Sequence, residues 1–291
     1  MRKRGLEPLR PKALEPKSSA SANFATSAAG LRVMQGGSPY RSGLFAKCLQ
    51  KGDLSSNVFL KGDSMHAPDG FINAPVSLGT GVVSASILAV ALSKARAELD
   101  EKAAPMAGLV AAYVFAVQML NFPVALGTSG HLMGGALAAI LIGPWTGMIA
   151  VSTVVILQAL LFADGGLTAL GFNVFNMAII TVIAGWLVFQ LVTKLVSGRT
   201  GVILGAFLAA LVSVPASASA FVIQYALGGT GTLDIMDVFI AMFSVHVLIG
   251  IGEGIITLLT VSAVLALRPD LVFGARGKVK AELEIRESKV S

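Results

Sequence analysis

The chain has 291 residues, of which 55% are hydrophobic and only 13% are charged, and its mean hydropathy is +0.78. Soluble domains carry about 25% charged residues, so this composition excludes an ordinary soluble globular protein. The net charge of +6 would by itself favour nucleic acid or an anionic surface as a partner, so its distribution along the chain has to be considered first.

The positive charge is concentrated in residues 1–64. This segment holds 11 Lys/Arg and 4 Asp/Glu, whereas the rest of the chain holds 11 Lys/Arg and 12 Asp/Glu. It is rich in Ser, Gly and Pro, has no apolar run long enough to span a bilayer, and contains the single cysteine, Cys48. We therefore expect a disordered basic leader or a start codon assigned too far upstream, no intrachain disulfide and no nucleic-acid partner.

The remainder of the chain is strongly apolar. Between residues 76 and 267 only 12 of 192 positions are charged, and the longest uncharged run covers residues 103–163. A membrane-spanning helix needs about 20 mostly apolar residues, so this run must be broken, and Gly and Pro place the breaks at 121–130 and 143–144. The pattern predicts an all-α integral membrane protein with about seven spans, the third of them short, at residues 76–94, 105–121, 131–143, 146–163, 168–194, 200–227 and 237–267.

The charges between these spans indicate the topology. Lys and Arg occur in alternate loops and after the last span, at Lys94, Arg96, Lys102, Lys194, Arg199, Arg268, Arg276, Lys278 and Lys280. The other loops have no Lys or Arg and carry Asp164 and Asp234. Under the positive-inside rule the Lys/Arg loops and the C-terminus are cytoplasmic, which places Met65 and His66 on the outer side.

Three histidines are the main candidates for chemistry: His66, His131 and His246. Met65 precedes His66 directly, and if translation began there, its amine, the His66 amide nitrogen and the His66 imidazole would form a compact three-nitrogen chelate. His131 is predicted on the same side of the membrane and would supply a fourth nitrogen. Such a set suits a late first-row divalent ion, whereas Zn²⁺ prefers a tetrahedral arrangement.

Several longer motifs give the chain a family resemblance. They are Met-His-Ala-Pro-Asp-Gly-Phe at 65–71, Asn-Phe-Pro-Val at 121–124, Gly-Thr-Ser-Gly-His-Leu-Met-Gly-Gly at 127–135, Ala-Asp-Gly-Gly-Leu-Thr-Ala-Leu-Gly at 163–171 and Asn-Val-Phe-Asn-Met at 173–177. In this order, and over about residues 65–270, the sequence resembles the CbiM/NikM proteins. These are the substrate-capturing membrane components of energy-coupling factor transporters for cobalt and nickel.

The resemblance implies a function and a metal site. The metal would be held by Met65, His66 and His131, with residues 65–270 as the transmembrane metal-binding domain and 271–291 as a charged cytoplasmic tail. The Pro-Asp-Gly after the histidine favours Co²⁺, for uptake that feeds cobalamin biosynthesis, with Ni²⁺ as the alternative. The ion is transported substrate, and no cofactor is expected.

The same resemblance implies partners and a location. ATP hydrolysis would belong to ATPase subunits, joined by a coupling transmembrane subunit and a small accessory membrane subunit. The chain itself would be a transporter component and no enzyme, a multi-pass protein of the cell (inner) membrane with its metal site facing outward.

One departure from the family pattern concerns Met65. Family members begin at the Met-His pair, but here 64 residues precede it, so Met65 offers an amide in place of a free amine. We expect a misassigned start codon. Cleavage before Met65, or a genuine basic tail with a differently built site, are the alternatives.

Other polar residues have weaker assignments. Asn121, Thr128 and Ser129 are candidates for orienting the loop around His131, because ligand histidines usually donate their second N–H to a nearby acceptor. His246 and Glu253 are seven residues apart and share a face of the last span. Packing or helix pairing is the favoured role for these two, and the more distant alternative is a secondary ion-coupled transporter that uses them.

Overall fold

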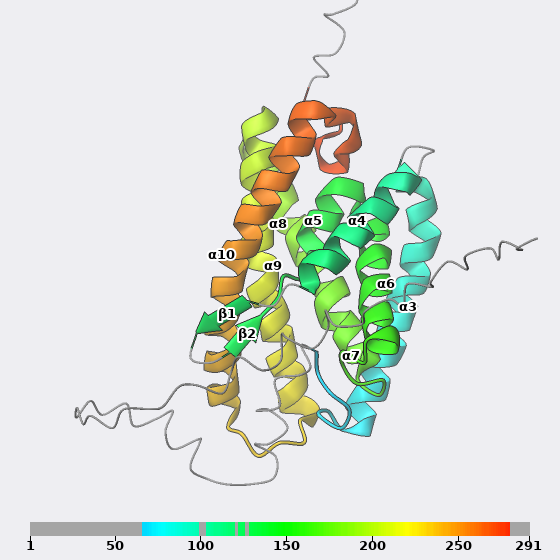
Figure 1. The fold of residues 1–291 in the computed structure, drawn as a ribbon, viewed down its shortest axis with the longest axis vertical. Helices are drawn as coiled ribbons and strands as arrows, with labels where there is room; N and C mark the ends of the chain where they lie inside the picture. Colours follow the sequence, from blue (N-terminus) through cyan, green and yellow to red (C-terminus); the bar gives the residue numbers. More distant parts are fainter. Residues whose placement is uncertain (1–65, 99–102, 120–121, 126–127, 280–291) are drawn as a thin grey trace, which may run out of the picture. The chain divides into compact units, whose positions relative to one another are not determined.

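The structure, a computed structural model, describes residues 66–98, 103–119, 122–125 and 128–279. Its helices lie side by side in a bundle (Figure 1). In chain order the elements are α3 (Ala74–Glu98), α4 (Ala103–Gln118), β1 (Phe122–Ala125), β2 (Thr128–Gly130), α5 (Gly135–Ile142), α6 (Pro144–Leu161), α7 (Leu170–Val174), the π-helix η1 (Phe175–Ile180), α8 (Thr181–Leu195), α9 (Gly198–Gly228), α10 (Ile235–Leu267) and the 3₁₀ turns η2 (Pro269–Leu271) and η3 (Phe273–Ala275).

The predicted all-α membrane fold is confirmed. Within the described residues, five helical segments are long and apolar enough to cross a membrane, and α4 is a shorter apolar helix. The segment formed by α7, η1 and α8 counts as one of the five. Each of the seven predicted spans therefore coincides with a helical segment.

The third predicted span is the exception in length. Helix α5 has eight residues, all buried, and at 1.5 Å per residue it covers about 12 Å of a hydrocarbon core of about 30 Å. It is bounded by Gly134 and Gly143, whose φ angles of 76° and 93° lie where a side chain is disfavoured. Helix α5 is thus a short element enclosed by the other helices, mainly α6 and α8.

A β-hairpin occupies the break predicted at residues 121–130. Strands β1 and β2 pair antiparallel, with Phe122 opposite Gly130. The sequence indicated a break here but no strands. The hairpin leads directly into His131, so it determines where that residue enters the bundle.

Glycines at helical spacing let helices approach closely, as expected for packing in lipid. A Cβ on Gly250 would meet the carbonyl oxygen of Leu211, and one on Gly254 would meet Phe207. Both neighbours belong to α9, against which α10 packs along its length.

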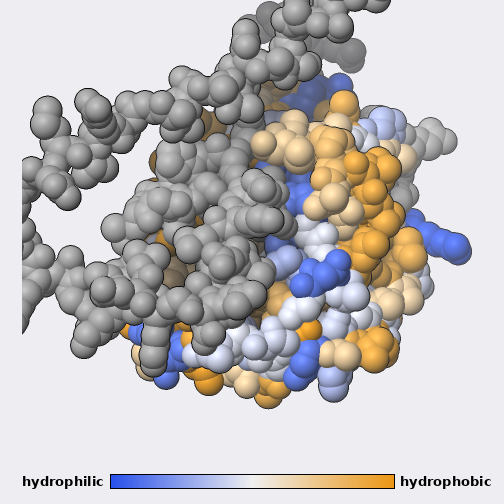
Figure 2. Space-filling model, turned by 60° about the horizontal axis from the view of Figure 1, so that its bottom comes forward, coloured by the Kyte–Doolittle hydropathy of each residue, from blue (hydrophilic) through white to orange (hydrophobic). Residues whose placement is uncertain are grey.

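Within the described residues, Lys and Arg lie at one end of the bundle, whereas acidic residues occur at both ends. The C-terminal ends of α3 and α10 lie at the same end, at the top of Figure 1, which carries Lys94, Arg96 and Arg268. Asp164 and Asp234 belong to loops at the other end. Figure 2 views this second end, where hydrophilic residues gather beside a hydrophobic flank. Which end faces the cytoplasm stays a prediction.

Candidate metal centre

His66 and His131, predicted from the sequence as ligands of one ion, lie in contact. Their ring centroids are 5.3 Å apart and the rings are edge to face, with an interplanar angle of 84°. Both residues are buried, with exposed fractions of 6% and 8%. Met65, the third predicted ligand, lies outside the described residues.

The loop after α6 packs against His66. Nδ1 of His66 lies 3.0 Å from the carbonyl oxygen of Asp164 and 3.4 Å from its Oδ1. Ala163 and Gly165 both have positive φ, 52° and 96°. A Cβ on Gly165 would approach Cβ of His66, so glycine at this position allows the loop to close against the imidazole.

Asn173, in α7, fixes the backbone next to His66. The amide nitrogen of Ala67 donates to its Oδ1 at 3.1 Å, and its Nδ2 donates to the carbonyl oxygen of Ala67 at 3.1 Å. The same carbonyl accepts from the amide of Gly166 at 2.9 Å. Both polar groups of the Ala67 main chain are therefore satisfied by groups about 100 residues away along the chain.

Asp69 forms a second attachment to the same loop. One of its carboxylate oxygens, Oδ1, accepts from the Thr168 hydroxyl at 2.6 Å and from the Thr168 amide at 2.7 Å. These bonds, the hydroxyl bond above all, hold the pKa of Asp69 below its usual 3.8, because they stabilise the ionised form.

The connection between α9 and α10 provides a third attachment. The Thr230 hydroxyl donates to the carbonyl oxygens of Gly70, at 2.7 Å, and Phe71, at 3.1 Å. The amide of Asn73 donates to the carbonyl of Gly228 at 2.7 Å. Residues 66–73, called the His66 segment below, are thus attached to two loops at one end of the bundle.

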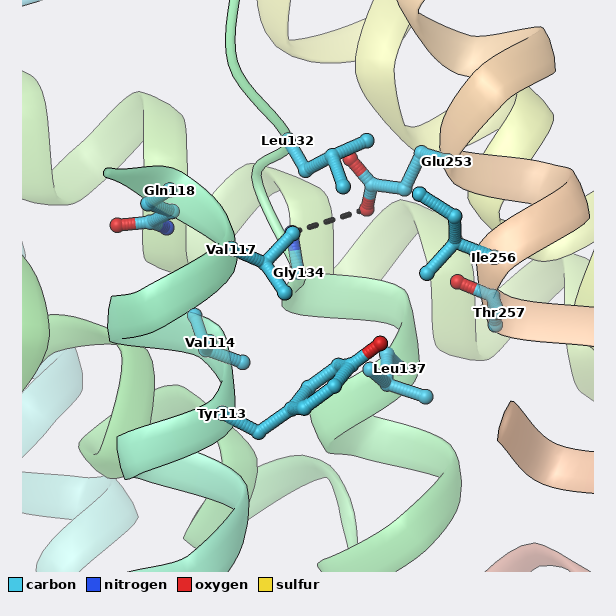
Figure 3. A pocket seen from close by; sticks show the side chains of 10 residues that line it. All are labelled: Tyr113, Val114, Val117, Gln118, Leu132, Gly134, Leu137, Glu253, Ile256 and Thr257. Carbon is cyan, nitrogen blue, oxygen red and sulfur yellow. Dashed lines mark hydrogen bonds between the residues drawn. The ribbon is translucent and has the colours of Figure 1, made fainter. Parts of the chain in front are cut away.

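Residues 131–134, called the His131 loop below, are held differently. The amides of Met133 and Gly134 donate to the two carboxylate oxygens of Glu253, at 2.7 and 2.9 Å. From the other side Gln118 donates through Nε2 to the carbonyl of Met133 at 2.7 Å. Figure 3 shows the carboxylate of Glu253 reaching from α10 to the amide of Gly134. His131 itself places Nδ1 3.0 Å from the carbonyl oxygen of Leu132.

His246 and Glu253 are not paired. Nδ1 of His246 lies 2.6 Å from the carbonyl of Met242, one turn earlier in the same helix, whereas Glu253 is directed at the His131 loop. Within the described part of the chain no hydrogen bond or ion pair joins the two. Sequence reasoning noted that they share a face of a helix, but it did not identify the partner of the carboxylate.

The structure does not describe the side chains of the three residues predicted to orient His131. Asn121 lies outside the described residues, and Thr128 and Ser129 are located only by their backbone, in β2. Asn173 was missed as an orienting residue, although it belongs to the Asn-Val-Phe-Asn-Met motif at 173–177 that contributed to the family resemblance.

Two imidazoles alone do not complete a metal site. Among the residues described, no group of three or more His, Cys, Asp or Glu side chains is arranged to hold a metal ion. The contact between His66 and His131 is therefore a pair of nitrogen donors, and further donors would have to come from backbone groups or from residues outside the described ranges.

Comparison with known proteins adds independent information. Residues 66–271 match the family model CbiM, described as the cobalt uptake substrate-specific transmembrane region. A relative from Archaeoglobus fulgidus, provisionally named fused nickel transport protein NikMN, is 37% identical to this chain over 215 residues. The match covers 72% of this chain and 68% of the relative. The cobalt transport protein CbiM of Sorangium cellulosum is 34% identical over 190 residues, or 64% and 83% of the two chains.

A solved structure agrees with these sequence matches. The crystal structure of a truncated transition metal transporter superimposes with a TM-score of 0.61 at 30% sequence identity, over 69% of this chain and 99% of the other. The residues matched by the family model, 66–271, correspond closely to those that the motifs delimit.

Proposed function

The chain belongs to the CbiM family of cobalt uptake transmembrane regions, and from this membership we propose that it is the metal-capturing membrane component of an ATP-driven importer. The proposed substrate is Co²⁺, taken up for cobalamin biosynthesis. Ni²⁺ is the second candidate, favoured by the nickel transport name of the Archaeoglobus fulgidus relative.

The edge-to-face contact of His66 and His131 is the observation that carries this proposal. With metal–nitrogen distances of about 2.0–2.1 Å, two imidazoles bound to one ion have ring centroids roughly 4.5 to 6.5 Å apart, depending on the angle between them. The observed 5.3 Å falls within this range. The two rings are thus close enough to bind one ion without a large displacement of either chain segment.

The remaining donors of the proposed site come from the backbone at Met65 and His66. A chelate ring that contains both the amide nitrogen and the imidazole of His66 closes through Nδ1, the ring nitrogen nearer the main chain. In the structure this nitrogen faces the carbonyl oxygen of Asp164. Metal capture would therefore exchange the Asp164 contact for the ion, and it would require a free amine at Met65.

The proposed partners follow from the transport role. The chain carries no nucleotide-binding motif, so ATPase subunits would supply the energy, with a coupling transmembrane subunit and a small accessory subunit. In this arrangement the protein lies in the cell (inner) membrane, with the His66 end outward and the Lys/Arg end and C-terminus in the cytoplasm.

Two measurements test the proposed site. Intact mass or amino-terminal sequencing of the protein made in its own cell should give a start at Met65. Calorimetric titration with Co²⁺ should then show affinity that rises with pH, because the amine, the amide and the imidazole must lose protons before they bind metal. A flat profile from mildly acidic to mildly alkaline pH, or a mature protein that retains residue 1, would exclude the amine–amide chelate.

A secondary transporter that uses His246 and Glu253 makes the opposite prediction for uptake. Vesicles that contain only this chain would take up metal, driven by an ion gradient. Reconstitution with and without ATPase subunits separates the two mechanisms, since the proposed importer moves metal across the vesicle membrane only with ATP and its partners.

A further inference from the structure

We infer that Glu253 is a positioning residue for metal capture, whose carboxylate holds the His131 loop so that the His131 imidazole faces His66. The inference rests on the proposed function, since it assumes that His131 binds the transported ion. It assigns to a carboxylate in the middle of α10 a role that acts through the loop and without contact to the metal.

The geometry of the carboxylate is that of a two-point clamp. Oε2 accepts from the amide of Met133 and Oε1 from the amide of Gly134, at 2.7 and 2.9 Å, two and three residues after His131. Glu253 is 1% exposed. Figure 3 shows its side chain reaching from α10 to the turn that precedes α5.

Burial of a carboxylate within a membrane-spanning helix is costly, and carboxylates in such positions usually serve a function. Gly134 is the N-cap of α5 and offers no side chain of its own. A side-chain cap is disfavoured at this position, because Gly134 has a φ of 76° and a Cβ there would lie 2.9 Å from the side chain of Val114. The free amides are instead bound by a side chain about 120 residues further along the chain, and this links the His131 loop to α10.

The loop is held from two helices. Gln118 of α4 donates to the Met133 carbonyl, whereas Glu253 of α10 accepts from the Met133 and Gly134 amides. A carbonyl and two amides of the same short segment are thus bound from two different helices. If the carboxylate is removed, the amides of Met133 and Gly134 lose their buried acceptors. The loop can then relax away from His66, and the two imidazoles no longer meet at the observed separation.

The test compares Glu253→Gln with His246→Ala in the full chain purified from its own cell. Gln keeps the size of Glu but offers one acceptor oxygen, and its NH₂ group opposes the second backbone amide. We expect Co²⁺ affinity, measured by titration with the metal alone, to fall about 10- to 100-fold, as for other residues that orient metal ligands. His246 lies in the same helix, but its side chain contacts the carbonyl of Met242 and not the His131 loop. His246→Ala should therefore leave the Co²⁺ affinity within about 2-fold of that of the unmodified chain.

A double-mutant cycle with His131→Ala separates positioning from a general effect on stability. If Glu253 acts only through His131, the double variant binds Co²⁺ no more weakly than His131→Ala alone, and the Co²⁺ ligand-field spectrum of Glu253→Gln shifts toward that of His131→Ala. Fully additive losses, or an unchanged spectrum, would overturn the inference. Should Glu253→Gln fail to fold, Glu253→Asp, which keeps the charge but shortens the reach, takes its place in the cycle.

The cycle also distinguishes this inference from the proposed function. If His131→Ala binds Co²⁺ as well as the unmodified chain, the proposed site and the inference both fail. If His131→Ala weakens binding while Glu253→Gln does not, only the role of Glu253 is refuted.

Discussion

The two segments that bring the imidazoles together are held by different parts of the molecule. The His66 segment is bound at its own end of the bundle by Asn173 of α7 and by Thr168 and Thr230 of two loops. The His131 loop is bound by Gln118 and Glu253, which project from α4 and α10. A displacement of α4 would therefore move the His131 loop without pulling on the His66 segment, whereas α10 is joined to the connection that holds that segment through Thr230. The comparison shows how helix movement can change the distance between two ligands that are both buried.

The most direct test of the two-segment site is to remove one of its two imidazoles. His66→Ala should reduce Co²⁺ affinity by more than about 100-fold, because it deletes a proposed ligand and not merely an orienting residue. Titration calorimetry gives the affinity, and circular dichroism confirms that the variant is folded. The matched control is His246→Ala, which should bind normally. If His246→Ala loses affinity and His66→Ala does not, the site lies within α10.

A smaller change loosens the His66 segment without touching its imidazole. Asn173→Ala removes both bonds to Ala67 and should weaken Co²⁺ binding about 10-fold, at the lower end of the effect of residues that orient ligands. Asn173→Asp keeps an acceptor for the Ala67 amide but loses the donor to its carbonyl, so it should fall between Ala and the unmodified chain. Equal losses for Ala and Asp would contradict the paired hydrogen-bond role.

The smallest expected effect concerns Asp69 and depends on pH. Its pKa is lowered in the folded chain by the Thr168 bonds, so its contribution to stability is present above the unfolded pKa of about 3.9 and is lost as pH falls through the lower folded value. The melting temperature of the unmodified chain should exceed that of Asp69→Asn by a few degrees at most near neutral pH. The difference should shrink below about pH 4.

Thr168→Val provides the control for this measurement. It removes the hydroxyl donor but keeps the backbone amide that also binds Asp69. The pH dependence should therefore diminish and not disappear. A melting-point difference that persists unchanged to the lowest pH would show that Asp69 acts by packing and not by charge.

The sequence predicted the fold well because membrane helices depend on local composition. A helical segment lies at each of the seven spans predicted from the uncharged runs, and Gly143 and Pro144 correctly separated α5 from α6. The β-hairpin and the exact length of α5 were not predicted. The short α5 depends on enclosure by other helices, since all its residues are buried and a helix of this length could not cross the bilayer in contact with lipid.

The candidate site was only partly predictable for the same reason. His66 and His131 stood out as rare residue types within motifs, and the structure brings them together. Glu253 was noted only for sharing a helix face with His246. Its partners are backbone amides, and no sequence pattern reveals that a main-chain N–H needs an acceptor from a distant helix. Asn173 was likewise hidden, because its contact with Ala67 exists only once the chain has folded.

The π-helix η1 fixes a rotational relation within one membrane crossing. Asn173 lies just before it and Phe189 of α8, which is fully buried, lies after it. A regular helix turns about 100° per residue, and a π-helical turn accommodates an additional residue without interrupting the helix. Converting Phe175–Ile180 to a regular α-helix with the same number of residues would therefore rotate Asn173 relative to Phe189 by about 100°. The core could then keep its packing only if Asn173 turned away from Ala67, so the π-helical turn sets the phase between the core face of this helix and its contact with the His66 segment.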